Sequence, residues 1–232
     1  MTSLLCVALL GATPVVFSAP AGDRPAGPSA ASPFNVILPS GRIVAPVGKS
    51  VPVGMNTLGV ALSPNGRYAI VSNDDEREFA AVNALDRRVV GGFTLTVVDT
   101  RTMRVSDVYV PKGADAFFIG IAALADPAHP GKTIVLVSEG PINEVRVFDL
   151  SPAGKLTVEG DTIAMPASAD EHFANQNHAF PASLVVGKDG RHAYVVNNLA
   201  NTVCAIDVKT RSLLGTAPVG FFPYGIAASG SR

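Results

Sequence analysis

The sequence predicts an all-β protein built from repeated four-stranded antiparallel sheets. Short runs rich in Val, Ile and Leu alternate with turns, and the pairs Asn65-Gly66 and Asp189-Gly190 supply residues that tolerate the positive φ angles of tight hairpins. The 232 residues include 22 Gly and 18 Pro but no Trp, a composition typical of a chain with many turns. Three similar segments also follow one another, so the sheets are expected to repeat.

Residues 1–21 are predicted to be a signal peptide. An apolar run from Leu4 to Leu10 is followed by small residues that offer cleavage after Ser18 or Ala21. No Lys or Arg precedes this run, which is atypical of such a leader, and the alternatives are a misassigned start or a buried strand. The sequence therefore favours export, to the periplasm or out of the cell, with Cys204 as the only cysteine of the mature chain.

Residues 22–33 are predicted to be a linker, and residues 34–232 to be the folded domain. The linker is rich in Pro, Ala, Gly and Ser, a composition that does not build a packed core. Lys plus Arg number 18 and Asp plus Glu 19, so the charge balance predicts no nucleic-acid partner. The later apolar runs are too short to span a bilayer, which predicts no membrane span.

Each of the three segments within the domain has one order of strands and turns. The first places strands within 58–73, 94–99 and 105–110, the second within 119–123, 133–139, 144–149 and 157–164, and the third within 180–186, 188–197, 202–207 and 213–219. The third strands end at Asp99, Asp149 and Asp207, spaced by roughly 50 to 60 residues. An aspartate there suits a side chain that accepts hydrogen bonds from the backbone of the following turn.

This repeat predicts a β-propeller, because a four-stranded sheet cannot cover both of its faces alone and such units stack radially. About three full blades are present, with flanking strands on either side. Residues 42–53 have the character of an outermost strand, and residues 223–228 that of the first strand of another blade. Closed propellers contain roughly four to eight blades, so we expect an incomplete propeller, an N-terminal fragment with exposed edges.

Several stretches are similar to the YVTN-type β-propeller repeat family. They are Tyr194-Val195-Val196-Asn197, Asn201-Thr202-Val203 through Ile206-Asp207, and Pro218-Val219-Gly220 with Pro223-Tyr224-Gly225. The resemblance covers nearly everything from about residue 41 onward and implies the propeller fold without a particular function. The second segment departs from it, with a longer turn at 125–131 and Glu139 where Asn is usual.

Two further stretches, residues 38–42 and 51–54, resemble a bacterial group in which a YVTN propeller precedes a phosphoesterase domain. This resemblance implies a C-terminal catalytic domain that is absent from this chain. It assigns no catalytic residue among the 232 residues.

The predicted ligand- or partner-binding face is the one that gathers two kinds of loop. In a four-stranded blade, the connection into the inner strand and the loop between the second and third strands lie at the same end of the sheet. The candidates at this end are Asn73, Asp74, Glu139, Phe180, Asn197, Asn198 and Tyr224. Loops on a rigid scaffold often carry function. The alternative for each residue is a structural role, because Asn and Asp at strand ends commonly bond their own turn.

No metal site or cofactor is predicted. His172 and His178 are weak candidates for metal ligands, but their spacing matches no familiar zinc pattern, and His129 and His192 are isolated in the sequence. The sequence has no phosphate-binding loop, nucleophile elbow or His-Glu-x-x-His motif, so no catalytic residue is assigned. Cys204 is expected to be a buried hydrophobe.

These observations favour an exported binding or scaffold module without catalysis of its own. Its partner is an unknown protein or small molecule. Two alternatives stay open. One is the N-terminal propeller of a two-domain phosphoesterase, and the other is a lactonase-like propeller enzyme that uses Glu139, Asn197 and His178 around the central tunnel.

Overall fold

The structure is a computed structural model that describes residues 27–29, 32–38, 42–54, 56–74, 81–82, 89–90, 93–111, 116–167 and 178–229. The chain divides into two compact units, Met1–Ser50 and Val51–Arg232. The predicted signal peptide lies outside the described residues. Nowhere in the described ranges is there a helix of the length and apolar character that crossing a membrane requires.

The first unit contains a three-stranded antiparallel sheet in the order β1-β2-β3. Its strands are β1 (Gly27–Ser29), β2 (Ser32–Ile37) and β3 (Ile43–Val44). β1 lies within residues 22–33, for which the composition predicted a linker. β3 lies within residues 42–53, predicted to be an outermost blade strand, and it pairs with β2.

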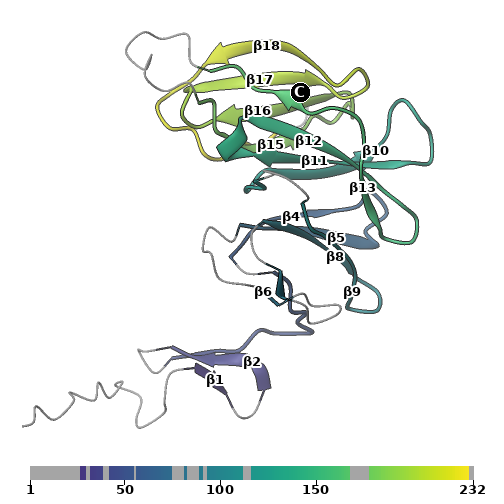
Figure 1. The fold of residues 1–232 in the computed structure, drawn as a ribbon, viewed down its shortest axis with the longest axis vertical. Helices are drawn as coiled ribbons and strands as arrows, with labels where there is room; N and C mark the ends of the chain where they lie inside the picture. Colours follow the sequence, from purple (N-terminus) through teal and green to yellow (C-terminus); the bar gives the residue numbers. More distant parts are fainter. Residues whose placement is uncertain are drawn as a thin grey trace, which may run out of the picture. The chain divides into compact units, whose positions relative to one another are not determined.

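The second unit contains three antiparallel sheets of four or five strands, which follow one another along the chain (Figure 1). The first blade has β4 (Thr57–Leu62), β5 (Tyr68–Asn73), β8 (Thr94–Asp99) and β9 (Arg104–Tyr109). The second has β10 (Ile121–Ala125), β11 (Thr133–Glu139), β12 (Glu144–Leu150), β13 (Leu156–Val158) and β14 (Ile163–Ala164). The third has β15 (Pro181–Val186), β16 (His192–Asn197), β17 (Thr202–Asp207) and β18 (Ser212–Pro218).

Two departures from this plan occur in the first and second blades. A small hairpin of β6 (Ala81–Val82) and β7 (Val89–Val90) lies between β5 and β8 in the sequence. In the second blade the predicted fourth strand is divided, because β13 and β14 both pair with β12. A single 3-10 turn, η1 (Gly140–Ile142), joins β11 to β12.

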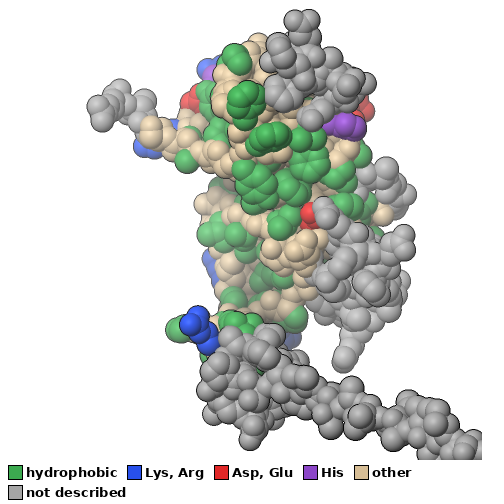
Figure 2. Space-filling view, turned by 90° about the vertical axis from the view of Figure 1, so that its left-hand side faces the viewer, with side chains coloured by type: hydrophobic (Ala, Val, Ile, Leu, Met, Phe, Trp, Pro, Cys, Tyr) green, Lys and Arg blue, Asp and Glu red, His purple; other side chains and the backbone are tan. Residues whose placement is uncertain are grey.

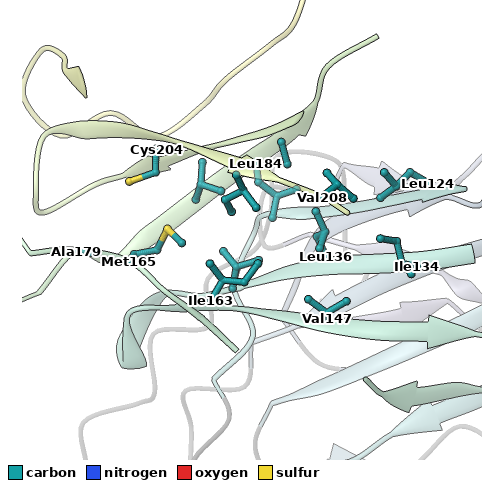
Figure 3. Close-up of a cluster of buried hydrophobic side chains, with 14 of the residues drawn as sticks. Leu124, Ile134, Leu136, Val147, Ile163, Met165, Ala179, Leu184, Cys204 and Val208 are labelled. Atoms are coloured by element: carbon teal, nitrogen blue, oxygen red, sulfur yellow. The ribbon is translucent and has the colours of Figure 1, made fainter. Parts of the chain in front are cut away.

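The second blade is buried on both of its faces. Side chains of a strand point alternately to opposite faces, and on β11 Val135 and Val137 join a core cluster with first-blade residues such as Leu95. Their neighbours Ile134 and Leu136 join a different cluster with third-blade residues, including Leu184, Ile206 and the buried Cys204 (Figure 3). The sheets therefore stack face to face as successive blades of a β-propeller, which confirms the predicted fold class. They form no closed ring within the described residues.

A close backbone approach is repeated where the innermost strands of neighbouring blades meet. A Cβ atom built on Gly59 would overlap the carbonyl oxygen of Ile119, and one built on Gly120 would overlap that of Ala182. In both places the glycine N–H also donates to a serine hydroxyl of the adjacent second strand, at 3.0 and 2.9 Å. Glycine is needed here because no side chain fits between the two backbones.

Residues 223–229 lie beside the third blade in the corresponding position. The N–H of Ser183, which is equivalent to Gly59 and Gly120, donates to the carbonyl oxygen of Tyr224 at 3.3 Å. This segment is therefore placed as the innermost strand of a further blade would be, although residues 223–229 are not assigned as strand.

The recurring aspartates bond the turns that follow them, as predicted, in two of the three blades. Oδ1 of Asp99 accepts the backbone N–H groups of Arg101 and Thr102 at 2.9 and 3.0 Å. Oδ1 of Asp207 accepts that of Thr210 at 2.8 Å. The bond from Thr102 is the main cause that lowers the pKa of Asp99. In the second blade Asp149 lies within β12 instead.

We expect Gly120→Ala to lower the free energy of unfolding by about 1–3 kcal/mol, because the added methyl group has to displace the backbone of the third blade. Gly215 in β18 is the matched control, since a Cβ there meets no atom within 4 Å and its φ is ordinary. Gly215→Ala should change stability by less than about 0.5 kcal/mol. Urea unfolding of both variants measures the difference, and equal losses would contradict the close approach of the inner strands.

The stability of the fold in acid should depend on the carboxyl group of Asp189. The backbone N–H of Arg191, followed by the side chain of His192, lowers the pKa of Asp189 from 3.8 to about 2. A carboxyl with a lower pKa in the folded state contributes stability above its unfolded pKa, and this contribution is lost as pH falls towards its folded pKa. The Asp189→Asn variant has no ionisable group at this position, so its stability lacks this dependence on pH. Urea unfolding should therefore show that the difference in free energy of unfolding between wild type and Asp189→Asn becomes smaller as pH falls from about 4.5 to about 2.5. A difference in free energy of unfolding that does not change with pH would contradict the lowered pKa of Asp189.

Candidate functional site

Two of the predicted strand-end residues, Asn73 and Asn197, join the second strand of a blade to the third. Both side chains are fully buried. Nδ2 of Asn73 donates to Oγ1 of Thr94 and of Thr96, at 3.1 and 3.0 Å. Nδ2 of Asn197 donates to Oγ1 of Thr202 at 3.1 Å and to the sulfur of Cys204 at 3.0 Å. Each amide therefore reaches its partner residue in the strand register and the residue two positions further on.

Glu139 occupies the same position in the second blade and uses a different chemistry. It is 0% exposed, and its Oε1 accepts a hydrogen bond from Nε of Arg146 at 3.0 Å. In the strand register, Arg146 stands where Thr96 stands in the first blade. The departure from Asn in the second segment is thus matched by a cation on the neighbouring strand, as a buried carboxylate requires.

A second repeated contact fixes the connections from one blade to the next. Asn143 and Asn201 each precede a third strand and have positive φ angles, 63° and 56°. Oδ1 of Asn143 accepts the N–H of Phe180 at 3.0 Å, and Oδ1 of Asn201 accepts that of Phe222 at 2.8 Å. Phe180 and Phe222 also have positive φ angles, 52° and 50°, which are unusual for bulky residues. The asparagines therefore hold two phenylalanines in strained conformations at the blade crossovers.

Aromatic rings from three successive blade connections meet at this end of the sheets. The ring of Phe118 lies edge-on to that of Phe180, with centroids 5.1 Å apart, and to that of Tyr224 at 6.0 Å. Gly140, which follows Glu139, packs against the ring of Phe180 so closely that a Cβ would contact it. The cluster is therefore continuous with the loop that leaves the second strand of the second blade.

Tyr224 links the aromatic cluster to an exposed segment, residues 221–224. Phe221 is 74% exposed, Phe222 57% and Tyr224 49%. The backbone of this loop is held because Nδ2 of Asn198 donates to the carbonyl oxygen of Pro223 at 3.2 Å. Hydrophobic side chains gather over the blades on the side shown in Figure 2. We call Phe118, Phe180, Phe221, Phe222 and Tyr224 the aromatic surface.

The remaining predicted residues are placed as follows. Asp74 is 3% exposed and its N–H donates to the carbonyl oxygen of Asn56 at 3.1 Å, within the first blade. His178 is exposed, and its Nδ1 lies 3.1 Å from Nδ2 of Asn143. His172 lies outside the described residues. The structure thus gathers Phe180, Asn198 and Tyr224 at one site. Asn73 and the backbone of Asp74 instead bond residues of the first blade.

Five residues of this site were not predicted from the sequence: Phe118, Asn143, Asn201, Phe221 and Phe222. A signal for the asparagines was present, because Asn-Glu-Val and Asn-Thr-Val open the third strands of the second and third blades. No comparable pattern marked Phe118. Its role follows only from ring contacts with two other blade connections.

No protein-family model and no curated protein matches the sequence. Membership of the YVTN repeat family and the link to a phosphoesterase domain therefore stay predictions.

Solved structures do resemble the chain. A protein of unknown function from Desulfotomaculum acetoxidans is 17% identical with a TM-score of 0.50, and the match covers 78% of this chain and 47% of that one. The β-propeller domain of Swd1 from Myceliophteria thermophila is 11% identical with a TM-score of 0.44, covering 81% and 50%. The periplasmic gluconolactonase of Pseudomonas aeruginosa is 12% identical with a TM-score of 0.45, covering 87% and 69%. The chain spans about half the length of the first two structures.

The ion pair of the second blade can be tested by converting it into the polar pair of the first blade. Arg146→Thr removes the cation beside the buried Glu139 carboxylate and should lower the free energy of unfolding by about 3–5 kcal/mol. The double variant Glu139→Asn with Arg146→Thr recreates the Asn73–Thr96 bond, which is 3.0 Å long in the first blade. Urea unfolding should show that the double variant regains most of the free energy of unfolding lost in Arg146→Thr. A double variant as unstable as Arg146→Thr alone would show that the two positions are not equivalent.

Proposed function

We propose that this chain is a protein-binding module whose contact surface is the aromatic surface. The observation that carries the proposal is the exposure of Phe221, Phe222 and Tyr224, which places three aromatic rings within four residues in contact with solvent. Large exposed apolar patches mark interaction sites on soluble proteins. Aromatic side chains are also enriched among the residues that contribute most to the affinity of protein interfaces.

A protein partner fits this surface better than a small ligand. Small molecules bind in concave sites that enclose most of their surface. Phe221 and Phe222 are instead more than half exposed on the loop that follows β18. Rings that protrude from a loop are suited to insert into a complementary surface of a partner.

The loop is held before any partner binds. The side chain of Asn201 bonds the N–H of Phe222, and that of Asn198 bonds the carbonyl oxygen of Pro223. The ring of Tyr224 packs edge-on against Phe118. Binding to a loop that is already ordered loses less conformational entropy, which favours affinity.

The buried strand-end residues support this surface from within the blades. Asn197 joins β16 to β17, the strand that Asn201 precedes, and Glu139 ends the strand that leads into Gly140 beneath Phe180. We assign these residues a supporting role. In the proposal, the exposed rings make the contact with the partner. Export is part of the proposal and is supported by the apolar run from Leu4 to Leu10 with the small residues that follow it.

Affinity purification of the full chain from its source cells tests the proposal. The wild-type chain should retain a partner protein in stoichiometric amount. With that partner purified, surface plasmon resonance should show that Phe222→Ala and Tyr224→Ala each weaken binding by about 2 kcal/mol or more, roughly 30-fold.

The matched control is Leu214→Ala in β18, an apolar residue that is 55% exposed and outside the aromatic surface. It should bind the partner as the wild type does, and thermal melts should show that all three variants stay folded. Recovery of no partner, or a partner whose affinity is unchanged in both aromatic variants, would contradict the proposed function.

A further inference from the structure

Three side chains that commonly bind metals converge in the second blade, away from the aromatic surface. Asp126 and His129 lie in the turn between β10 and β11, and Glu159 follows β13. One ligand atom from each residue lies within 4.8 Å of the other two. Because the β10–β11 turn follows the innermost strand, it lies at the opposite end of the sheet from the loop between β11 and β12.

The two carboxylates differ in how they are satisfied. Asp126 is 5% exposed, and its Oδ2 lies 2.8 Å from Nδ1 of His129. Oε1 of Glu159 forms an ion pair with Nη2 of Arg211 at 3.0 Å. Its second oxygen, Oε2, is buried and has no hydrogen-bond partner within the described structure. A buried acceptor that makes no bond is energetically costly, and a bound cation would remove that cost.

The third blade provides a natural comparison. Its turn between β15 and β16 repeats the arrangement, with Asp189 bonded to the backbone N–H of His192 and to the Nδ1 atom of its ring. Asp126 accepts the backbone N–H of His129 in the same way, at 3.3 Å. An aspartate–histidine contact in this turn is therefore part of the blade architecture. The second blade differs by the third group, Glu159, and its cluster is the single one found among the described residues.

We propose that Asp126, His129 and Glu159 bind one divalent transition-metal cation, with Zn²⁺ as the ion that the residues fit. Zn²⁺ is bound by imidazole nitrogens and by Asp or Glu oxygens, and three protein ligands leave a fourth position for water. The two carboxylates and the guanidinium of Arg211 together carry one negative charge, which a cation offsets. The side chain of His129 is 56% exposed, so an ion can reach the site from solvent.

Isothermal titration of the chelator-treated full chain with Zn²⁺ alone tests this site. The wild type should bind one Zn²⁺ at a tight site. His129→Ala and Glu159→Gln should each weaken that binding more than about tenfold, because loss of even an outer-shell partner typically costs roughly 10- to 100-fold in metal affinity. Zn²⁺ should also raise the melting temperature of the wild type, because it binds the folded chain, but not that of His129→Ala.

His192→Ala is the matched control, because it alters the same turn in the blade that lacks the third carboxylate. It should bind Zn²⁺ as tightly as the wild type and show the same thermal shift. His129 lies in an exposed turn, so His129→Ala keeps the test valid if Glu159→Gln unfolds through the loss of its pairing with Arg211. Wild-type affinity in His129→Ala, or an equal loss in His192→Ala, would overturn the proposal.

Discussion

The structure depends on burying both faces of the second blade's sheet. On β11, neighbouring residues serve different interfaces, because Val135 and Val137 pack towards the first blade and Ile134 and Leu136 towards the third. A shift of the strand register by one residue would exchange these two sets and disrupt both interfaces. The glycines of the inner strands add a second constraint, since they allow the backbones of neighbouring blades to approach each other where the blades converge.

Polar contacts at one end of the blades hold the residues of the aromatic surface in place. The buried side chains of Asn73, Asn197 and Glu139, the last paired with Arg146, tie the second strands to the third strands. Asn143 and Asn201 then extend the same end of the sheet to the next blade by bonding the N–H groups of Phe180 and Phe222. The aromatic rings are therefore placed by contacts that the blade repeat itself supplies. A binding surface at this position therefore requires few contacts other than those that the blades already make.

The sequence predicted what is local and missed what joins distant segments. The strand at 94–99 and the turn at Asp99 could be predicted because valine-rich runs and side-chain-to-backbone bonds act over a few residues. The division of the second blade's fourth strand and the contact between Phe118 and Tyr224 depend on packing between distant segments, which composition and spacing do not encode. His129 was isolated in the sequence for the same reason. In the sequence, its neighbour Glu159 lies beyond three further strands of the second blade, β11, β12 and β13.

The second sheet packs its two faces against two different neighbours. Nuclear Overhauser effects between methyl groups measure this most directly. The methyl groups of Val135 and Val137 should show effects to first-blade residues, including Leu95. Those of Ile134 and Leu136 should show effects to third-blade residues, including Leu184. Methyl groups of Leu136 and Val137 that both contact the same sheet would contradict the arrangement of the blades.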